Sequence, residues 1–117
     1  MTYLFVEMYN YTDEWRGLPE PDRVAFVGRL AEILGALPAL GVDVLGYAMN
    51  DPDTDQRAPY DFFCVYQVRD RATQRAFEDN IRASGWYRYF AQCNLSGAAA
   101  PAMKILGDNA NLLPPSA

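Results

Sequence analysis

The chain has 117 residues, half of them hydrophobic, and a formal net charge of −5. This size and composition indicate one globular domain and exclude a chain that is disordered throughout. Its cationic residues are nine arginines and a single lysine, Lys104, and they are scattered among fifteen acids. We therefore expect no binding to nucleic acid or to an anionic membrane, because both need a basic surface that neutralises phosphates.

Neither a membrane-spanning segment nor a secretory leader is expected. No apolar run approaches the roughly 20 residues that cross a bilayer. The start, Met1 to Phe5, lacks basic residues and continues directly into a strand pattern. Cys64 and Cys93 stand in hydrophobic surroundings without C-x-x-C spacing, which is typical of reduced, buried thiols. These features favour a cytoplasmic protein.

Histidine is absent from the sequence. This absence removes the usual general base near neutral pH, the commonest metal ligand and the usual haem ligand. Any catalysis must then use carboxylates, tyrosines, arginines, amides or a bound cofactor, and we predict neither a metal nor a cofactor.

The first half of the chain predicts a strand, a helix and a second strand. Tyr3 to Tyr9 is rich in aromatic and β-branched residues and lacks glycine and proline. Glu20-Pro21-Asp22 is a favourable helix start, and apolar residues at helical spacing continue until Pro38. Val42 to Met49 is the next strand, in which Gly46 indicates a bulge or a close approach of another group.

The second half repeats this order after a polar loop, Asn50 to Pro59, which is a candidate mobile flap. Tyr60 to Val68 is almost entirely apolar, as central strands are. Asp70 is a candidate N-cap for the second helix, which is expected to end at Gly85. A short helical turn over 86–90 follows.

Gln92 to Gly97 is a weaker fourth strand, along which Gln92, Asn94 and Ser96 share one face and could offer hydrogen bonds to one ligand. We assign residues 1–98 to one domain and residues 99–117 to a C-terminal extension rich in small residues and proline.

This order of elements predicts a ferredoxin-like α+β fold. Two β-α-β units with right-handed crossovers interleave into a four-stranded antiparallel sheet with both helices on one face. On the first strand, Leu4, Val6 and Met8 form an aliphatic face that we expect to lie under the helices. The uncovered face would then hold large apolar residues, namely Tyr3, Phe5, Tyr9, Tyr47 and Met49. Such a face is not expected to remain in water, and a second copy covering it would make a homodimer.

Four segments carry a resemblance to known proteins: Phe5-Val6-Glu7-Met8-Tyr9, Asn50-Asp51-Pro52-Asp53, Tyr60-Asp61-Phe62-Phe63 and Gly85-Trp86-Tyr87-Arg88-Tyr89-Phe90. With the layout over about residues 3–97, they resemble the dimeric α+β-barrel superfamily, and more closely a small bacterial family within it whose function is not established. The superfamily includes cofactor-free polyketide monooxygenases, polyketide cyclases and muconolactone isomerases. The resemblance implies a barrel of two paired sheets and a small aromatic or polyketide-like substrate. Its histidine-dependent chemistry cannot apply to a chain without histidine.

Glu7 is the first candidate catalytic residue. A carboxylate in mid-strand among aromatic residues is costly to bury unless it is paired, and an apolar setting raises its pKa towards the range of a useful general base. The alternative is an ion pair with an arginine, within the sheet or between subunits.

Several polar and aromatic residues are further candidates. We predict catalytic roles for Tyr47 and Asn94 beside Glu7, and substrate contacts from Tyr9, Asp61, Tyr66, Trp86 and Tyr89. A tryptophan and an asparagine hold an anionic substrate in the cofactor-free oxygenases of the superfamily, which is what the resemblance suggests for Trp86 and Asn94. The alternatives are a salt bridge from Asp61 to Arg57, and core or interface packing for the aromatic residues.

The sequence leaves three functions open: a metal-free enzyme, a ligand-binding protein without turnover, and a structural homodimer. The candidate pocket could lie between the sheet and the helices or inside the barrel.

Overall fold

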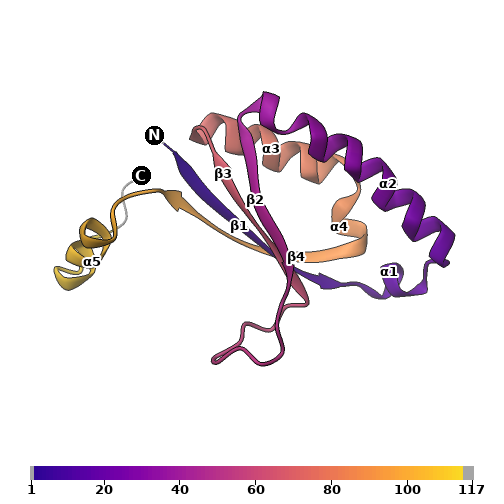
Figure 1. Cartoon of the computed structure of the whole chain (residues 1–117), viewed down its shortest axis with the longest axis horizontal. Coiled ribbons are helices and arrows are strands. Elements are labelled where there is room, and N and C mark those ends of the chain that lie inside the picture. The colour runs from indigo at the N-terminus through magenta and orange to yellow at the C-terminus, as the bar shows by residue number, and fades with distance from the viewer. Residues whose placement is uncertain (1, 115–117) are drawn as a thin grey trace.

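The computed structural model describes residues 2–114 and confirms the ferredoxin-like α+β fold (Figure 1). The elements in chain order are β1 (Tyr3–Tyr11), α1 (Asp13–Gly17), α2 (Glu20–Ala36), the 3-10 turn η1 (Pro38–Leu40), β2 (Val42–Met49), β3 (Phe62–Val68), α3 (Arg71–Ala83), α4 (Trp86–Tyr89), β4 (Phe90–Ala98) and α5 (Ala102–Ala110). The strands form one sheet in the order β2-β3-β1-β4, and every neighbouring pair is antiparallel.

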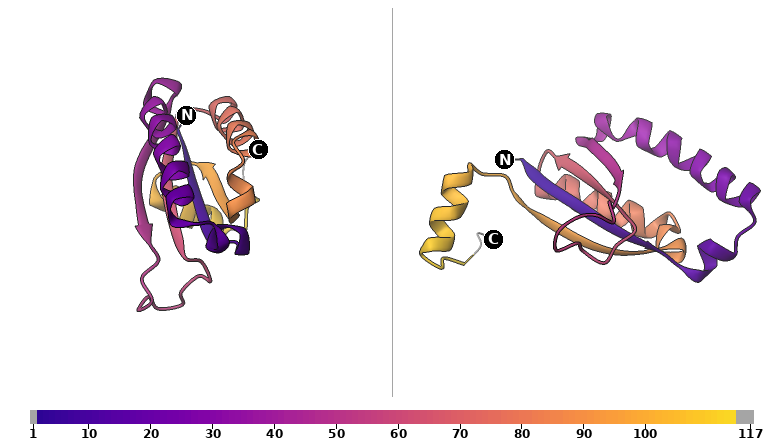
Figure 2. Two further views of the ribbon diagram at one scale, coloured as in Figure 1. Left: turned by 90° about the vertical axis from the view of Figure 1, so that its right-hand side faces the viewer. Right: turned by 60° about the horizontal axis from the view of Figure 1, so that its bottom comes forward.

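The two long helices cover one face of this sheet. Figures 1 and 2 show α2 and α3 side by side over the sheet, and α5 beyond the far end of β4. Residues 99–114 of the C-terminal extension therefore do not lie over the opposite face, and Met103 is 76% exposed. The division into residues 1–98 and 99–117 stays a prediction, and residues 1 and 115–117 lie outside the described part.

Local sequence signals set both ends of α3 as predicted. The Asp70 side chain accepts a hydrogen bond from the backbone N–H of Thr73 at 2.7 Å, which satisfies one free donor at the start of α3. The helix ends at Ala83, Ser84 is its C-cap residue, and Gly85 follows with φ +84°. Gly41 takes the same left-handed conformation, φ +85°, between η1 and β2. Only glycine adopts this conformation without strain.

The expected assignment of the two sheet faces was wrong. On β1, the side chains buried beneath the helices are Phe5, Glu7 and Tyr9, whereas Leu4 is 45% exposed on the bare face. The same reversal places Tyr3 on the helical side, where it packs against the core. The physical reason is that Glu7 is hydrogen-bonded by its neighbours, so its face can be buried, and the large aromatic rings beside it fill the space beneath the helices.

A β-bulge in β2 determines where Tyr47 points. The register with β3 shifts between Val44 and Gly46, as the glycine indicated. After the shift Tyr47 pairs with Cys64, which in turn pairs with Glu7, so all three lie on the helical face. Tyr47 and Met49 therefore do not belong to the bare face, which is the second part of the correction.

The loop between β2 and β3 is held by hydrogen bonds to its own backbone. Arg57 donates to the carbonyl oxygens of Asn50, Asp51 and Tyr60 at 3.1 Å each. The Asn50 amide donates to the carbonyls of Ala58 and Tyr60. Arg57 thus uses its guanidinium on backbone oxygens, and no ion pair joins it to Asp61 in the described part of the chain.

Candidate functional site

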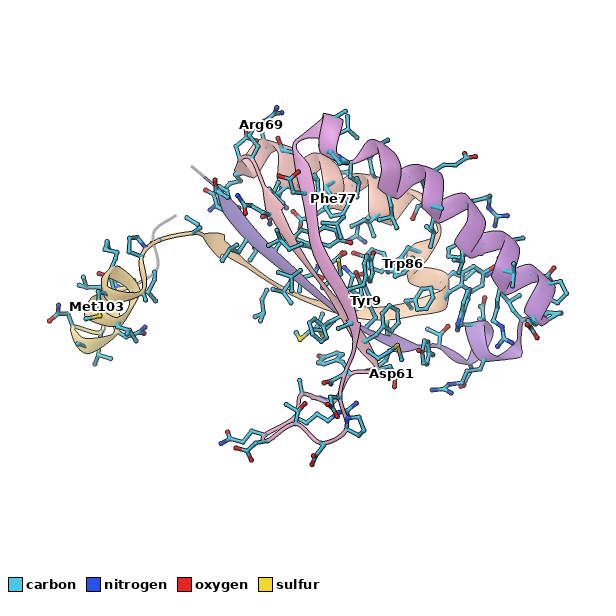
Figure 3. All side chains as sticks on the ribbon, in the orientation of Figure 1. Tyr9, Asp61, Arg69, Phe77, Trp86 and Met103 are labelled. Carbon is cyan, nitrogen blue, oxygen red and sulfur yellow. The ribbon has the colours of Figure 1, made fainter. Side chains whose placement is uncertain are left out.

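A cavity of about 730 Å³ lies between the sheet and the two long helices. Its walls are mainly aliphatic and aromatic, and this size suits a small organic molecule. The sheet contributes Glu7, Tyr9, Val42, Tyr47 and Tyr66, and the helical side contributes residues that include Leu30, Leu34, Leu37, Phe77, Ile81 and Trp86. Figure 3 shows Tyr9, Phe77 and Trp86 in the space between sheet and helices. Of the two expected positions, this cavity is therefore the one between sheet and helices.

Glu7 is the buried carboxylate of this cavity, with only 2% of its surface exposed. One carboxylate oxygen accepts a hydrogen bond from the Tyr9 hydroxyl at 2.7 Å, and the other accepts one from the Gln92 amide nitrogen at 2.5 Å. Among residues 2–114 it forms no ion pair. The alternative of an arginine partner within the chain is thus not what the structure contains.

The environment of Glu7 favours its protonated form relative to a carboxylate in water. Burial raises its pKa, because a charge is costly in an apolar setting. The hydrogen bonds from Tyr9 and Gln92 act in the opposite direction, since they stabilise the anion, but the net pKa remains above the ordinary value of 4.5. A base of this kind is stronger than a solvated glutamate and is ready to accept a proton.

Two tyrosines from neighbouring strands meet beside Glu7. The hydroxyls of Tyr47 and Tyr66 lie 3.1 Å apart, close enough for one to donate to the other. Burial raises the pKa of Tyr47 to about 12 and raises that of Tyr66 above its usual range. Both phenols therefore stay protonated near neutral pH and can donate hydrogen bonds to a ligand oxygen.

Gln92 and Trp86 complete the polar part of the site. The Trp86 indole N–H donates to Gln92 Oε1 at 2.8 Å, and Gln92 Nε2 donates to Asn94 Oδ1 at 2.7 Å. Trp86 also packs edge-on against Tyr9, with 5.3 Å between ring centroids. A chain of hydrogen bonds thus runs from α4 through β4 to the carboxylate on β1.

The structure brings most of the predicted site residues to one place. Glu7, Tyr9, Tyr47, Tyr66 and Trp86 all line the cavity. Asn94 lies directly opposite Glu7 in the β1–β4 pair, but it is not among the lining residues, and its side chain accepts a hydrogen bond from Gln92.

Asp61 and Tyr89 lie elsewhere. The Asp61 carboxylate accepts a hydrogen bond from the backbone N–H of Tyr11 at 3.0 Å, at the base of the long loop (Figure 3). Tyr89 packs against Trp15 and Phe26, beyond the cavity.

Gln92 was expected, with Asn94 and Ser96, to offer a hydrogen bond to a ligand; the structure instead places it outside the cavity lining and gives its hydrogen bond to Glu7. Its alternation with Asn94 and Ser96 along β4 places the three on one face. The residues that face them across the pair with β1 are Tyr9, Glu7 and Phe5. The alternation was visible in the sequence, but the register that pairs Gln92 with Tyr9, one position diagonally from Glu7, was not.

The donor set of the cavity does not suit a metal or a haem group. No group of three or more His, Cys, Asp or Glu residues that could hold an ion occurs within 2–114. Of the side chains that hold haem iron, namely His, Cys, Met and Tyr, the cavity is lined by tyrosines alone, and the hydroxyls of Tyr9, Tyr47 and Tyr66 already hydrogen-bond Glu7 or one another. Cys64 is fully buried outside the lining, and burial raises its thiol pKa to about 11, whereas Cys93 is exposed, contrary to expectation.

Comparison with known proteins gives a family and a fold. The sequence model of a family of unknown function, DUF6616, matches residues 2–112. No curated protein matches. No helix in the described chain is long and apolar enough to cross a membrane.

The similar solved structures include chlorite dismutases. A double mutant of the chlorite dismutase from Candidatus Nitrospira defluvii superposes with a TM-score of 0.70 at 15% identity, over 91% of this chain and 43% of that one. The chlorite dismutase of the same organism in complex with imidazole gives the same values. A different protein assigned as a chlorite dismutase gives 0.55 at 14% identity, over 97% and 53%. The chain thus spans about half the length of these proteins or less, and at this identity the similarity concerns the fold alone.

Proposed function

We propose that this chain, which belongs to the DUF6616 family of unknown function, is a small-molecule enzyme that acts without a metal on an aromatic or polyketide-like substrate. The reaction class is a monooxygenase, cyclase or isomerase, with Glu7 as general base. The observation that carries this proposal is a carboxylate only 2% exposed, with no cationic partner in the described residues, that lines an apolar cavity of about 730 Å³. Desolvation makes such a carboxylate a better base.

The first chemical step is proton transfer. Glu7 takes a proton from an acidic C–H or O–H group, the electron pair stays on the substrate as an enolate or phenolate, and Glu7 becomes neutral. The Tyr47 and Tyr66 hydroxyls, 3.1 Å apart, are donors placed to stabilise the oxygen that becomes negative.

Three outcomes are compatible with this step. Return of the proton to another carbon atom is an isomerisation. Attack of the carbanion on a carbonyl of the same molecule, with the proton returned to the resulting alkoxide, is a cyclisation. A monooxygenase needs O₂ as co-reactant: a CH₂ group is oxidised to a carbonyl, and O₂ is reduced, with one oxygen atom in the product and the other in water.

The side chains that line the cavity support an aromatic or polyketide-like substrate. Tyr9, Tyr47, Tyr66, Phe77 and Trp86 present aromatic side chains to it, so a flat ring system can pack against them. The polar side chains of Arg69 and Asn80 also belong to the lining but are exposed. A largely apolar ligand with one ionisable group is therefore the best match.

We also propose that the protein is a homodimer paired through the bare face of the sheet. That face carries aliphatic and aromatic residues from three strands, namely Leu4, Val6, Met8, Phe63, Val65 and Leu95. Exposed apolar faces of this kind are typical of interfaces. The chain aligns with 43% of the longer chlorite dismutase chain, so two copies would approach the length of one such chain. This supports a second copy as the partner.

The experiment that tests the enzyme is a screen of aromatic and polyketide-like compounds, followed by kinetics of Glu7→Gln. We expect turnover to fall by about 10²–10⁴-fold, the usual contribution of a general base, while the substrate still binds. Asp61→Asn is the matched control, because Asp61 lies outside the cavity and its loss of charge should leave turnover unchanged. Unchanged turnover in Glu7→Gln would remove Glu7 as base.

The alternative is a homodimer that binds a small ligand without turnover. Saturable binding with no product formed would favour it. Residence in the cytoplasm remains part of the proposal, and the two free thiols, Cys64 and Cys93, are compatible with a reducing compartment.

A further inference from the structure

The side chain of Gln92 joins Glu7 to Trp86 in one defined orientation. An indole N–H can only donate and an ionised carboxylate can only accept. Gln92 must therefore turn its oxygen to Trp86, at 2.8 Å, and its nitrogen to Glu7, at 2.5 Å. Asn94 accepts from the same nitrogen, but its own amide can turn over, so it imposes no preference. Trp86 can only donate, so it is the partner that fixes the orientation of the Gln92 amide.

We propose that Trp86 is a positioning residue that keeps the Gln92 amide nitrogen directed at Glu7 and thereby favours the ionised form of Glu7 that acts as base. This inference rests on the proposed function of Glu7. Its physical basis is the cost of the alternative arrangement. A protonated Glu7 could donate to the Gln92 oxygen only if the Gln92 amide turned over. The NH₂ group of Gln92 would then face the Trp86 N–H, so that two donors would oppose each other.

The surroundings of Glu7 make these donors important. Within the described chain no ion pair balances its charge. The ionisable groups that act on Glu7 are tyrosines, a thiol and an acid: Tyr9 on its own strand, Tyr47 on β2, Cys64 and Tyr66 on β3, Glu78 on α3 and Tyr87 on α4. Arg69, directly after β3, lines the same cavity, but its ion pair in the described residues is with Asp70 and not with Glu7. Hydrogen-bond donors must therefore stabilise the anion where a cation usually would.

The test follows the titration of Glu7 in the intact chain without ligand, by NMR of its ¹³C-labelled carboxyl group. Gln92→Leu removes the donor and should raise the titration midpoint, on the order of one pH unit. Trp86→Phe keeps an aromatic ring but removes the N–H, and should raise the midpoint by a smaller amount. In the Gln92→Leu background, Trp86→Phe should cause no further shift. In a Tyr9→Phe background it should still cause its own shift.

Two results would overturn the proposal. One is a midpoint that Trp86→Phe leaves unchanged. The other is the same shift from Trp86→Phe with and without Gln92, which would mean that the indole acts through burial alone. The measurement needs no substrate, so its failure is distinguishable from a failure of Glu7→Gln to lower turnover.

A second measurement on the unmodified protein covers the case in which a variant does not fold. The chain has only two tryptophans. The indole N–H resonance of Trp86 should move with the same midpoint as the Glu7 carboxyl, because Gln92 couples them. Trp15, which packs against Phe26 and Phe90, is the internal control and should not follow it. A Trp86 signal that ignores the titration of Glu7 would contradict the proposal.

Discussion

The Tyr9 hydroxyl donates a 2.7 Å hydrogen bond to the carboxylate of Glu7, two positions earlier on the same strand. Residues two apart on a strand share a face, so a single segment of β1 supplies both the buried acid and one of its donors. The second donor, Gln92, comes from the neighbouring strand β4. The carboxylate can therefore be buried beneath the helices without an arginine, and remains open to the cavity.

The first prediction concerns stability against pH. Burial raises the pKa of Glu7 in the folded protein above 4.5, its ordinary value, so the folded state binds the proton more tightly than the unfolded state. The contribution of Glu7 to stability is then fully present below about pH 4.5 and is lost as the pH rises through the folded pKa. In urea titrations across this window, the free energy of unfolding of the wild type should decline with rising pH. That of Glu7→Gln, which has no carboxyl group at this position, should lack this decline.

Asp70 provides a contrast in the same experiment. Its hydrogen bonds to Thr73 hold the pKa below 3.8, so its contribution is present above that value and is lost as the pH falls. The two groups therefore act in opposite directions. If the wild type instead became more stable relative to Glu7→Gln as the pH rises, the raised pKa of Glu7 would be contradicted.

The sequence predicted the four strands, the two long helices and the short helix α4 because their signals are local, whereas α1 and α5 were not predicted. Glu20 and Pro21 at the start of α2, Asp70 before α3 and Gly85 after it all lie where the structure has those boundaries. The cap hydrogen bond of Asp70 reaches only to Thr73, three residues away. Such signals depend on neighbours along the chain, which the sequence contains in full.

The faces of the sheet could not be predicted, because they depend on contacts between distant residues. The carboxylate of Glu7 indicated a solvent-exposed face. Its donor Gln92 is 85 residues away and becomes apparent only from the pairing of β1 with β4. Gly46 indicated that a bulge could occur. The register shift that directs Tyr47 into the cavity is apparent only from the pairing of β2 with β3. The sequence thus identified which residues could form the site more easily than it predicted how they contact one another.

The second prediction is that the bare sheet face forms the dimer. Leu4 and Leu95 are 45% and 61% exposed on this face, so replacing both with arginine should not disturb the fold of one subunit. Two buried, like-charged patches would oppose pairing. Light scattering should give twice 13.2 kDa for the wild type and 13.2 kDa for the double variant.

Val24→Arg is the matched control, since Val24 is exposed on α2, away from the sheet. It should leave the dimer intact. A wild-type protein that is monomeric at micromolar concentration would remove the proposed interface.

The third prediction separates two glycines by their backbone. Gly41 has φ +85°, which costs a residue with a Cβ about 1–2 kcal/mol. Its added Cβ would also lie 3.1 Å from the Arg69 guanidinium carbon. A Cβ on Gly46 meets nothing within 4 Å, and its φ is not positive. Gly41→Ala should therefore lower the free energy of unfolding by that amount in urea titrations, while Gly46→Ala stays within about 0.5 kcal/mol. Equal losses would show that the bulge itself requires glycine.

The last prediction assigns Asp61 to the loop and not to the ligand. Its carboxylate accepts from the Tyr11 backbone N–H at 3.0 Å, and its own N–H donates to the Tyr9 carbonyl at 2.9 Å, so it fastens the end of the long loop to β1. Asp61→Ala leaves the Tyr11 N–H without this partner and should cost about 1–3 kcal/mol of unfolding free energy. Asp61→Asn keeps an accepting oxygen and should recover most of the loss. If both variants instead unfold like the wild type but fail to bind a compound that the wild type binds, Asp61 contacts the ligand after all, and the loop must then fold over the cavity when the ligand is present.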